Sequence, residues 1–134
     1  MSSFHLQIVT PDGLFFDGSA ELLKVRTTNG DVGIMAQHAN YVAALGMGEA
    51  VVEAQGTRRR AACIGGMLAV LGGEVRVIAT TFEWAEQIDA ERAKQALQRA
   101  EARLQDPART PEEKRLAKAA QRRAQVRLSV SEQK

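Results

Sequence analysis

Short stretches of apolar and β-branched residues, separated by turn signals, fill the first two thirds of the chain. Apolar and polar positions alternate in several of them, as in strands with one buried face. Turn signals are Pro11-Asp12-Gly13, Asn29-Gly30, Gln55-Gly56, Gly65-Gly66 and Gly72-Gly73. The predicted strands cover residues 4–9, 22–28, 49–54, 60–64, 67–71 and 75–79. Many short strands at this spacing predict a β-sandwich or barrel.

The hydrophobic period changes from about two to about 3.6 after Trp84, which predicts a helix. Asp89 is a suitable N-cap for this helix, and Asp106-Pro107 ends it because proline disfavours helical geometry in the preceding residue. One apolar stripe runs along the helix and consists of Ala93, Ala96, Leu97, Ala100 and Leu104.

A second helix begins at a capping box. Thr110 is the expected N-cap, Pro111 the first helical residue and Glu113 the partner of the cap. The apolar stripe of this helix is Ala117, Ala120, Ala124 and Leu128. The short connection between the two helices predicts an antiparallel hairpin.

The chain therefore divides into two domains, residues 1–84 and residues 85–134. All eleven glycines lie between Gly13 and Gly73, within the strand-rich part. The fold class is α+β, with a β-sandwich followed by a helical hairpin. Alanine stripes bury little area, so we expect a hairpin that opens or detaches easily. An ordinary solvent-facing hairpin of high helix propensity is the alternative.

Charge is unevenly distributed between these two parts. Residues 1–84 carry six basic and eight acidic side chains, whereas residues 85–134 carry twelve basic and eight acidic ones. A basic partner surface is therefore expected in the hairpin. The run Arg58-Arg59-Arg60 has no interleaved aromatic residue and fits a hairpin turn, so no nucleic-acid partner is predicted.

The composition is that of an ordinary globular protein, with 45% hydrophobic and 25% charged residues. No apolar stretch approaches the roughly 20 residues of a membrane helix, and the first residues do not resemble a secretory signal. We therefore expect a protein inside the cell with no direct membrane insertion. The single cysteine, Cys63, is expected to be a buried apolar residue.

Catalytic motifs are missing from the sequence. There is no GxxxxGK[ST] phosphate loop, and the segment from Gly46 to Val51 lacks the third glycine of a dinucleotide fingerprint. The two histidines and Cys63 are too few and too scattered for a zinc site. Ser129 and Ser131 have no nearby histidine. We expect no catalytic residue, no metal site and no catalytic cofactor.

The segment Gly30-Asp31-Val32-Gly33-Ile34-Met35-Ala36-Gln37-His38-Ala39 resembles a motif of the epsilon-subunit family of bacterial F-type ATP synthases. Three further segments match the family in order: Thr10-Pro11-Asp12-Gly13, Gly65-Gly66-Met67-Leu68-Ala69-Val70 and Ile88-Asp89-Ala90-Glu91-Arg92-Ala93. The resemblance covers nearly the whole chain. Ala36-Gln37 replaces the usual Pro-Gly and Asn40-Tyr41 the usual Pro-Leu, which affects the detailed shape of that loop.

The resemblance implies a ten-stranded sandwich that binds the gamma stalk and the c-ring, followed by a regulatory hairpin. Asp31 and His38, in one loop after the Gly30 and Gly33 turn, are the implied c-ring contact. From residue chemistry alone, a capped acid and a hydrogen-bonded histidine in a hairpin explain them as well.

The resemblance also implies that the hairpin binds ATP, with or without Mg, as a regulatory ligand. Arg92 and Arg99 are seven residues apart on one helix face, and Arg123 and Arg127 are four apart on the other helix. Guanidinium groups suit phosphate oxygens. The implied ATP-binding residues are Glu83, Ile88, Asp89, Arg92, Ala93, Arg99, Arg123 and Arg127. A solvated charged face is the alternative.

The function that follows is that of a non-catalytic rotor subunit in the central stalk of a proton-translocating ATP synthase. The family implies that ATP holds the hairpin folded, and that the extended hairpin meets the alpha and beta catalytic subunits and inhibits hydrolysis. Its place is the cytoplasmic face of the bacterial membrane, as a peripheral protein. Two rivals stay open: a stand-alone module that dimerises through the hairpin, and a small enzyme using His38 and Asp31.

Overall fold

The computed structural model describes residues 2–132. The chain divides into two compact units, with the boundary between Trp84 and Ala85. The first unit is built of strands and the second of helices, so the predicted α+β class is confirmed.

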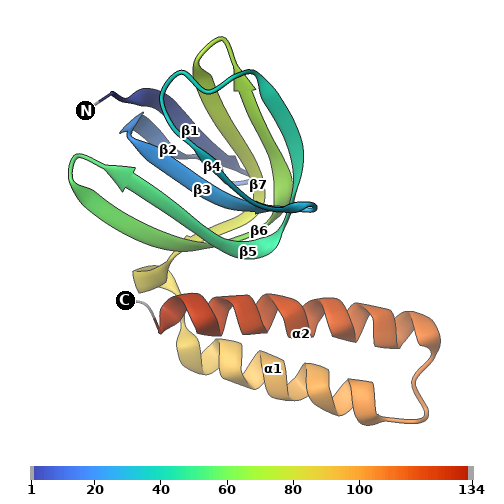
Figure 1. The fold of residues 1–134 in the computed structure, drawn as a ribbon. Helices are drawn as coiled ribbons and strands as arrows, with labels where there is room; N and C mark the ends of the chain where they lie inside the picture. The colour runs from blue at the N-terminus through green and yellow to red at the C-terminus, as the bar shows by residue number, and fades with distance from the viewer. Residues whose placement is uncertain (1, 133–134) are drawn as a thin grey trace. The chain divides into compact units, whose positions relative to one another are not determined.

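A seven-stranded sheet forms the first unit, with the strand order β2-β1-β7-β6-β5-β3-β4. Neighbouring strands are antiparallel except for β1 and β7, which run parallel. The sheet folds over on itself into a sandwich (Figure 1). The strands are β1 (Phe4–Thr10), β2 (Gly13–Ala20), β3 (Leu22–Thr27), β4 (Gly30–Ile34), β5 (Tyr41–Ala54), β6 (Thr57–Leu71) and β7 (Glu74–Trp84).

The core of the sandwich follows from alternation along the strands. On β1, Phe4, Leu6 and Ile8 are buried, whereas His5 is exposed and Gln7 half-buried. The same alternation on β7 buries Val75, Val77 and Ala79. Residues of one phase therefore fill the core, and residues of the other phase form the outer face of the sheet.

The expected number of ten strands differs from the seven observed. Three strands are long, since β5 has 14 residues, β6 has 15 and β7 has 11. The pair Gly65-Gly66, predicted as a turn, lies inside β6 instead. Both glycines have positive φ, 72° and 121°, so the strand bends there without ending.

Gly66 also allows a close approach between β6 and β7. A Cβ atom at this position would lie 2.0 Å from the carbonyl oxygen of Ile78. No side chain fits there, so this glycine is required by the packing of one strand on the next as well as by its φ.

Two strands were not predicted, β2 and β4. Their sequences carry glycine and little regular alternation, which hid them. As a result, the predicted loop from Asp31 to His38 is wrong in its first half: residues 30–34 are strand β4, and the irregular segment is residues 35–40. Within this segment Gln37 has φ 66°, in the left-handed region that favours glycine.

Several predicted turns are confirmed. Gln55 and Gly56 connect β5 to β6, with φ of 54° and 78°. The sign of both angles is that of a two-residue hairpin turn that matches the twist of its strands. Gly72 and Gly73 connect β6 to β7 with φ of 57° and 83°.

The second unit is an antiparallel pair of helices, α1 (Ala90–Gln105) and α2 (Pro111–Ser131), preceded by a short 3-10 turn, η1 (Ala85–Gln87) (Figure 1). Asp89 caps α1 by accepting from the backbone N–H of Arg92 at 3.0 Å. The capping box at α2 is complete: Glu113 N–H donates to Thr110 Oγ1 at 3.1 Å, and Thr110 N–H donates to Glu113 Oε1 at 3.2 Å.

The two helices pack on each other through alanine. Ala93 and Ala100 of α1 and Ala117 and Ala124 of α2 are all buried, and α2 also buries Val126 and Val130. The four alanines belong to the predicted stripes, and the larger Leu97, Leu104 and Leu128 of those stripes are only half-buried. Each contact between the stripes therefore buries little apolar area, as the sequence indicates.

Candidate interaction surfaces

An apolar row crosses the outer face of the sheet over five strands. Its members lie directly opposite one another in the pairing register, in the order Leu14, Val9, Ile78, Met67 and Ala44. Leu14 is 58% exposed, Ile78 50% and Met67 43%. We call these five residues the outer row. Val9 is half-buried and the other four are exposed. An apolar row of this length on an outer face is typical of a surface that binds another protein.

Two neighbouring rows on the same face carry polar groups. The first of them runs from Asp17 through Gln7 and Arg76 to Ala69. Arg76 donates from Nη2 to Gln7 Oε1 at 3.1 Å. The second includes His5 and Glu74. Between these rows lies a hollow of about 400 Å³, lined by His5, Gln7, Ala69, Leu71, Glu74, Val75 and Arg76.

His5 links three strands at the edge of this hollow. Its Nε2 lies 2.5 Å from Asp17 Oδ1 on β2, and its Nδ1 lies 3.0 Å from Glu74 Oε2 on β7. The hydrogen bond with Asp17 is the main cause that raises the pKa of His5 above its ordinary value, and Glu74 acts in the same direction. We call His5, Asp17 and Glu74 the His5 cluster.

Sequence reasoning missed both the outer row and the His5 cluster. The run Val75–Ala79 predicts a strand but gives no sign that Ile78 faces outward. Its sequence neighbours, Val77 and Ala79, are apolar too, so the alternation of apolar and polar residues does not show which face is buried. The sequence shows His5 only as one of two scattered histidines. Its carboxylate partners lie 12 and 69 residues away, so only the strand pairing brings them together.

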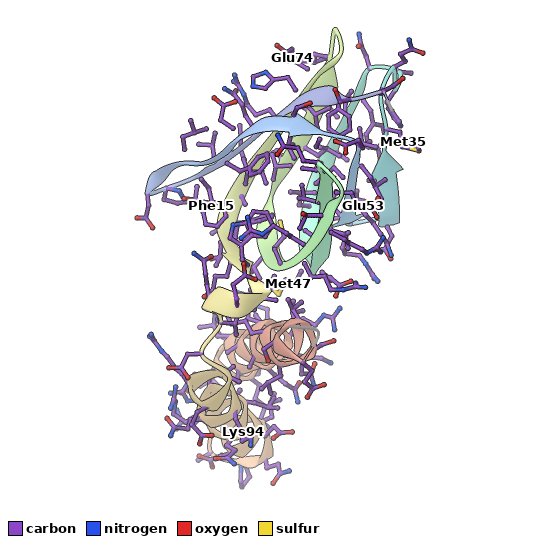
Figure 2. All side chains as sticks on the ribbon, turned by 90° about the vertical axis from the view of Figure 1, so that its left-hand side faces the viewer. Phe15, Met35, Met47, Glu53, Glu74 and Lys94 are labelled. Carbon is purple, nitrogen blue, oxygen red and sulfur yellow. The ribbon has the colours of Figure 1, made fainter. Side chains whose placement is uncertain are left out.

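One end of the sandwich carries exposed apolar side chains near the turn between β6 and β7. Asn40 Oδ1 accepts from Gly72 N–H at 3.0 Å and so joins the 35–40 segment to this turn. Met35 is 63% exposed and Leu71 is 55% exposed. Glu74 lies toward this turn and Met47 toward the opposite end of the sandwich (Figure 2).

Asp31 and His38 do not share a turn. Asp31 lies on β4, and Arg26 Nε of β3 donates to its Oδ1 at 2.8 Å. His38 lies beyond the end of β4, with Nδ1 2.7 Å from the carbonyl oxygen of Ala39 and its ring 6.0 Å from that of Tyr41. Asp31 therefore lies near the start of β4, and His38 lies beyond its end.

The predicted ATP-binding residues are spread over three elements. Glu83 lies on β7, Ile88 and Asp89 lie just before α1, Arg92, Ala93 and Arg99 lie on α1, and Arg123 and Arg127 lie on α2. Arg92 and Arg99 are exposed, whereas Arg123 and Arg127 are half-buried. Ile88 and Ala93 are buried. One carboxylate oxygen of Asp89 is already engaged by the cap of α1.

A hollow of about 320 Å³ lies along the helical hairpin, lined by Arg103, Arg109, Glu113, Leu116, Ala117, Ala119, Ala120 and Arg123. Arg123 is the one predicted ATP residue in that lining. Arg109 is paired with Asp106 and Glu113 at 3.3 and 3.0 Å. Within this hollow, therefore, the four arginines proposed for phosphate are not gathered.

Other candidate chemistry resolves simply. Cys63 is buried, and burial raises the pKa of its thiol to about 12, so it stays protonated. The segment from Gly46 to Val51 lies inside β5 and is no phosphate loop. Among residues 2–132, no three His, Cys, Asp or Glu side chains are placed to hold a metal ion. None of the helices in that range has the length and apolar character needed to cross a bilayer.

Family models match both units. Residues 3–85 match the beta-sandwich domain of the ATP synthase Delta/Epsilon chain, and residues 86–132 match its long alpha-helix domain. Fold and match together define the class, a non-catalytic subunit of ATP synthase. The chain belongs to the ATP synthase delta/epsilon family. This assignment confirms the expectation of a subunit without a reaction of its own.

Curated relatives named ATP synthase epsilon chain span the same length. The relative from Caldicellulosiruptor bescii is 36% identical over 133 residues, which are 99% of this chain and 96% of the relative. That from Shouchella clausii is 37% identical over 134 residues, 100% of this chain and 98% of the relative. That from Alkaliphilus oremlandii is 45% identical over 103 residues, 77% of each chain.

Two solved structures share the fold. A chain from the mitochondrial ATP synthase of Euglena gracilis, determined as OSCP, F1 and c-ring, has a TM-score of 0.84 at 23% identity and covers 96% of this chain and 81% of its own. A chain from the central stalk and c-ring of Tetrahymena thermophila has a TM-score of 0.67 at 12% identity, with 95% of both chains covered.

Proposed function

We propose that this chain connects the gamma stalk to the c-ring of a proton-translocating F-type ATP synthase and inhibits ATP hydrolysis through its helical hairpin. The observation that carries the proposal is the outer row, an exposed apolar surface on a protein whose relatives are named as ATP synthase subunits. The complex lies at the cytoplasmic face of the bacterial membrane, and this chain is peripheral to it.

The gamma subunit docks on the outer row. The row crosses five strands of one sheet, so its backbone is rigid before binding and little ordering is required. It is flanked by Gln7 and Arg76, which supply hydrogen bonds at the border of an apolar centre. This arrangement matches the anatomy of protein interfaces, with apolar residues inside and polar groups at the rim.

Co-purification with gamma tests this docking. The proposal expects a complex of the two chains in size-exclusion chromatography. A homodimer that excludes gamma would instead support the rival stand-alone module.

The c-ring contact is proposed at Asp31 and His38. Asp31 is exposed on the edge strand β4, and His38 belongs to the 35–40 segment, whose Met35 is exposed. Exposed apolar and hydrogen-bonding groups together suit a polar loop between two membrane helices of a c subunit.

Single cysteines at Asp31 and at His38, tested separately in the assembled enzyme, check this contact. Each is expected to crosslink to a c-subunit loop. Because Asp31 lies near the start of β4 and His38 beyond its end, a crosslink at one position alone would assign the c-ring contact to that end of the strand. Crosslinks only to the catalytic head would reject the orientation.

The hairpin is proposed to have two positions. Its alanine packing makes the folded form easy to lose, and ATP restores that form by binding it selectively. Residues 85–134 carry twelve basic and eight acidic side chains. In the extended form this basic hairpin contacts the alpha and beta subunits, where it binds an acidic segment of beta, and it inhibits hydrolysis.

The ATP site is proposed to use Glu83, Ile88, Asp89, Arg92, Ala93, Arg99, Arg123 and Arg127. Arg92 and Arg99 support it because both are exposed on one helix. Asp89 retains a carboxylate oxygen beyond the one that caps α1. Folding of the hairpin on ATP would bring the four arginines to the phosphates.

Calorimetry of Arg92→Ala and Arg123→Ala tests the site. A charged hydrogen bond contributes about 1.5 to 3 kcal/mol, so each variant is expected to bind ATP about ten- to a hundredfold more weakly. Arg115→Ala is the matched control, because Arg115 is exposed on α2 and paired with Glu112. Unchanged ATP affinity in both test variants would show that these arginines form a solvated charged face and no ATP site.

A further inference from the structure

We infer that docking of the outer face on its stalk partner is linked to a proton on His5, and that the protonated His5 cluster is the form that docks. The inference rests on the proposed docking of gamma.

The geometry requires the proton. Both ring nitrogens of His5 face carboxylate oxygens, Nε2 facing Asp17 at 2.5 Å and Nδ1 facing Glu74 at 3.0 Å. An ionised carboxylate accepts hydrogen bonds and donates none, and a neutral imidazole has a single N–H. Only the imidazolium donates to both oxygens at once. Loss of the proton therefore leaves one carboxylate without its donor.

The charged groups around His5 also favour its protonated form. Asp17 faces it from β2 and Glu74 from β7, while Arg76, two residues further along β7, is engaged by Gln7. The neighbouring positions on β6, Ala69 and Leu71, carry no charge. The two carboxylates favour the proton, and the pKa of His5 is raised above its ordinary value, chiefly by Asp17.

The cluster lies on the docking face. His5, Gln7 and Val9 are successive outward residues of β1, and Val9 belongs to the outer row. His5 and Glu74 also line the hollow beside that row. A partner that covers the row and extends over this hollow removes water from the cluster.

Removal of water decides which form docks. The protonated cluster has its hydrogen bonds made and a net charge of −1, whereas the deprotonated cluster has a net charge of −2 and an unmatched carboxylate. Covering an unmatched charge is costly. The partner therefore binds the protonated form more tightly, and binding in turn favours uptake of the proton.

Edge strand β2 gives a second consequence. It pairs with β1 alone in the sheet, and its register shifts next to Ile8 and Val9. Asp17 in the middle of β2 is tied across β1 to β7 through His5. Deprotonation of His5 should therefore speed amide hydrogen exchange in β2 before it affects the central strands.

The first test follows the His5 ring of the full chain by NMR from about pH 5.5 to about pH 9, in the wild type and in Asp17→Asn. We expect His5 to titrate at higher pH in the wild type than in Asp17→Asn, because Asp17 is the main cause that raises its pKa, and we expect the β2 amides to shift with His5. Equal midpoints in the two proteins would overturn the inference without touching the proposed function.

The second test measures gamma binding to the wild type and to His5→Gln across the same range. For the wild type we expect the affinity to fall above the midpoint of free His5, by up to about tenfold per pH unit. For His5→Gln, which carries no titrating proton, we expect weaker binding without that slope. Two wild-type results would overturn the inference: binding with no slope, or a slope retained in His5→Gln. No binding at any pH would instead contradict the proposed docking itself.

Discussion

Met67 on β6 and Ile78 on β7 lie directly opposite each other on the outer face, and each side chain is about half exposed. Ala44 continues the row beyond Met67, and Val9 continues it beyond Ile78. The centre of the outer row is therefore this pair. If gamma covers it, the pair becomes the most desolvated part of the interface.

Ile78→Glu tests that position. The new carboxylate would be buried in the complex without a partner, so we expect gamma to bind at least about thirtyfold more weakly, or about 2 kcal/mol. The free chain should keep its unfolding temperature, because Ile78 is exposed in it. Leu116→Glu is the matched control, since Leu116 is equally exposed but belongs to α2. An equal loss of affinity for gamma in both variants would contradict the docking on the outer row.

Gly66→Ala is expected to destabilise the sandwich by about 3 kcal/mol. The new methyl group would meet the Ile78 carbonyl oxygen at 2.0 Å, and φ of 121° is unfavourable for alanine. Gly72→Ala is the control, because it also has positive φ, 57°, but nothing within 4 Å of the added Cβ. Chemical denaturation of the two variants measures the difference. If Gly66→Ala lowers the free energy of unfolding no more than Gly72→Ala does, β6 bends for another reason.

The start of α2 should depend on pH. Its capping box lowers the pKa of Glu113, chiefly through the backbone N–H of Thr110 and then through Arg109. Because the folded pKa is the lower one, the stabilisation is present above the unfolded pKa and is lost as pH falls through the folded pKa. We expect the protection of the amides in the first turn of α2, relative to the intrinsic exchange rate at each pH, to fall in acid. Glu113→Gln keeps an acceptor for Thr110 without a titrating group, so its protection should not depend on pH in this way. The same loss of protection in Glu113→Gln would show that another group causes the pH dependence.

Local signals explain which parts of the fold could be predicted. The caps at Asp89 and Thr110 and the turn at Gln55-Gly56 depend on residues within a few positions, and all three are confirmed. The prediction of a turn at Gly65-Gly66 is wrong, because the same dipeptide also permits a bend inside a long strand. Its role is set by the carbonyl of Ile78, which lies far along the chain.

The surfaces were harder to predict than the elements. Whether Met67 and Ile78 are exposed depends on strand register, and the order of strands in the sheet is not encoded locally. The same holds for His5 and Glu74, which meet through the parallel pairing of β1 and β7. The ATP and c-ring residues came from a family resemblance, and they stay predictions.

Gamma binding by a fragment that ends at Gln87 tests the central claim most directly. This fragment keeps all seven strands and the outer row and removes both long helices. The account predicts that it unfolds cooperatively and binds gamma, in calorimetry, within about threefold of the affinity of the full chain, since no helix contributes to the docking face. A folded fragment that fails to bind gamma, while the full chain binds, would place the docking surface in the hairpin and contradict the account.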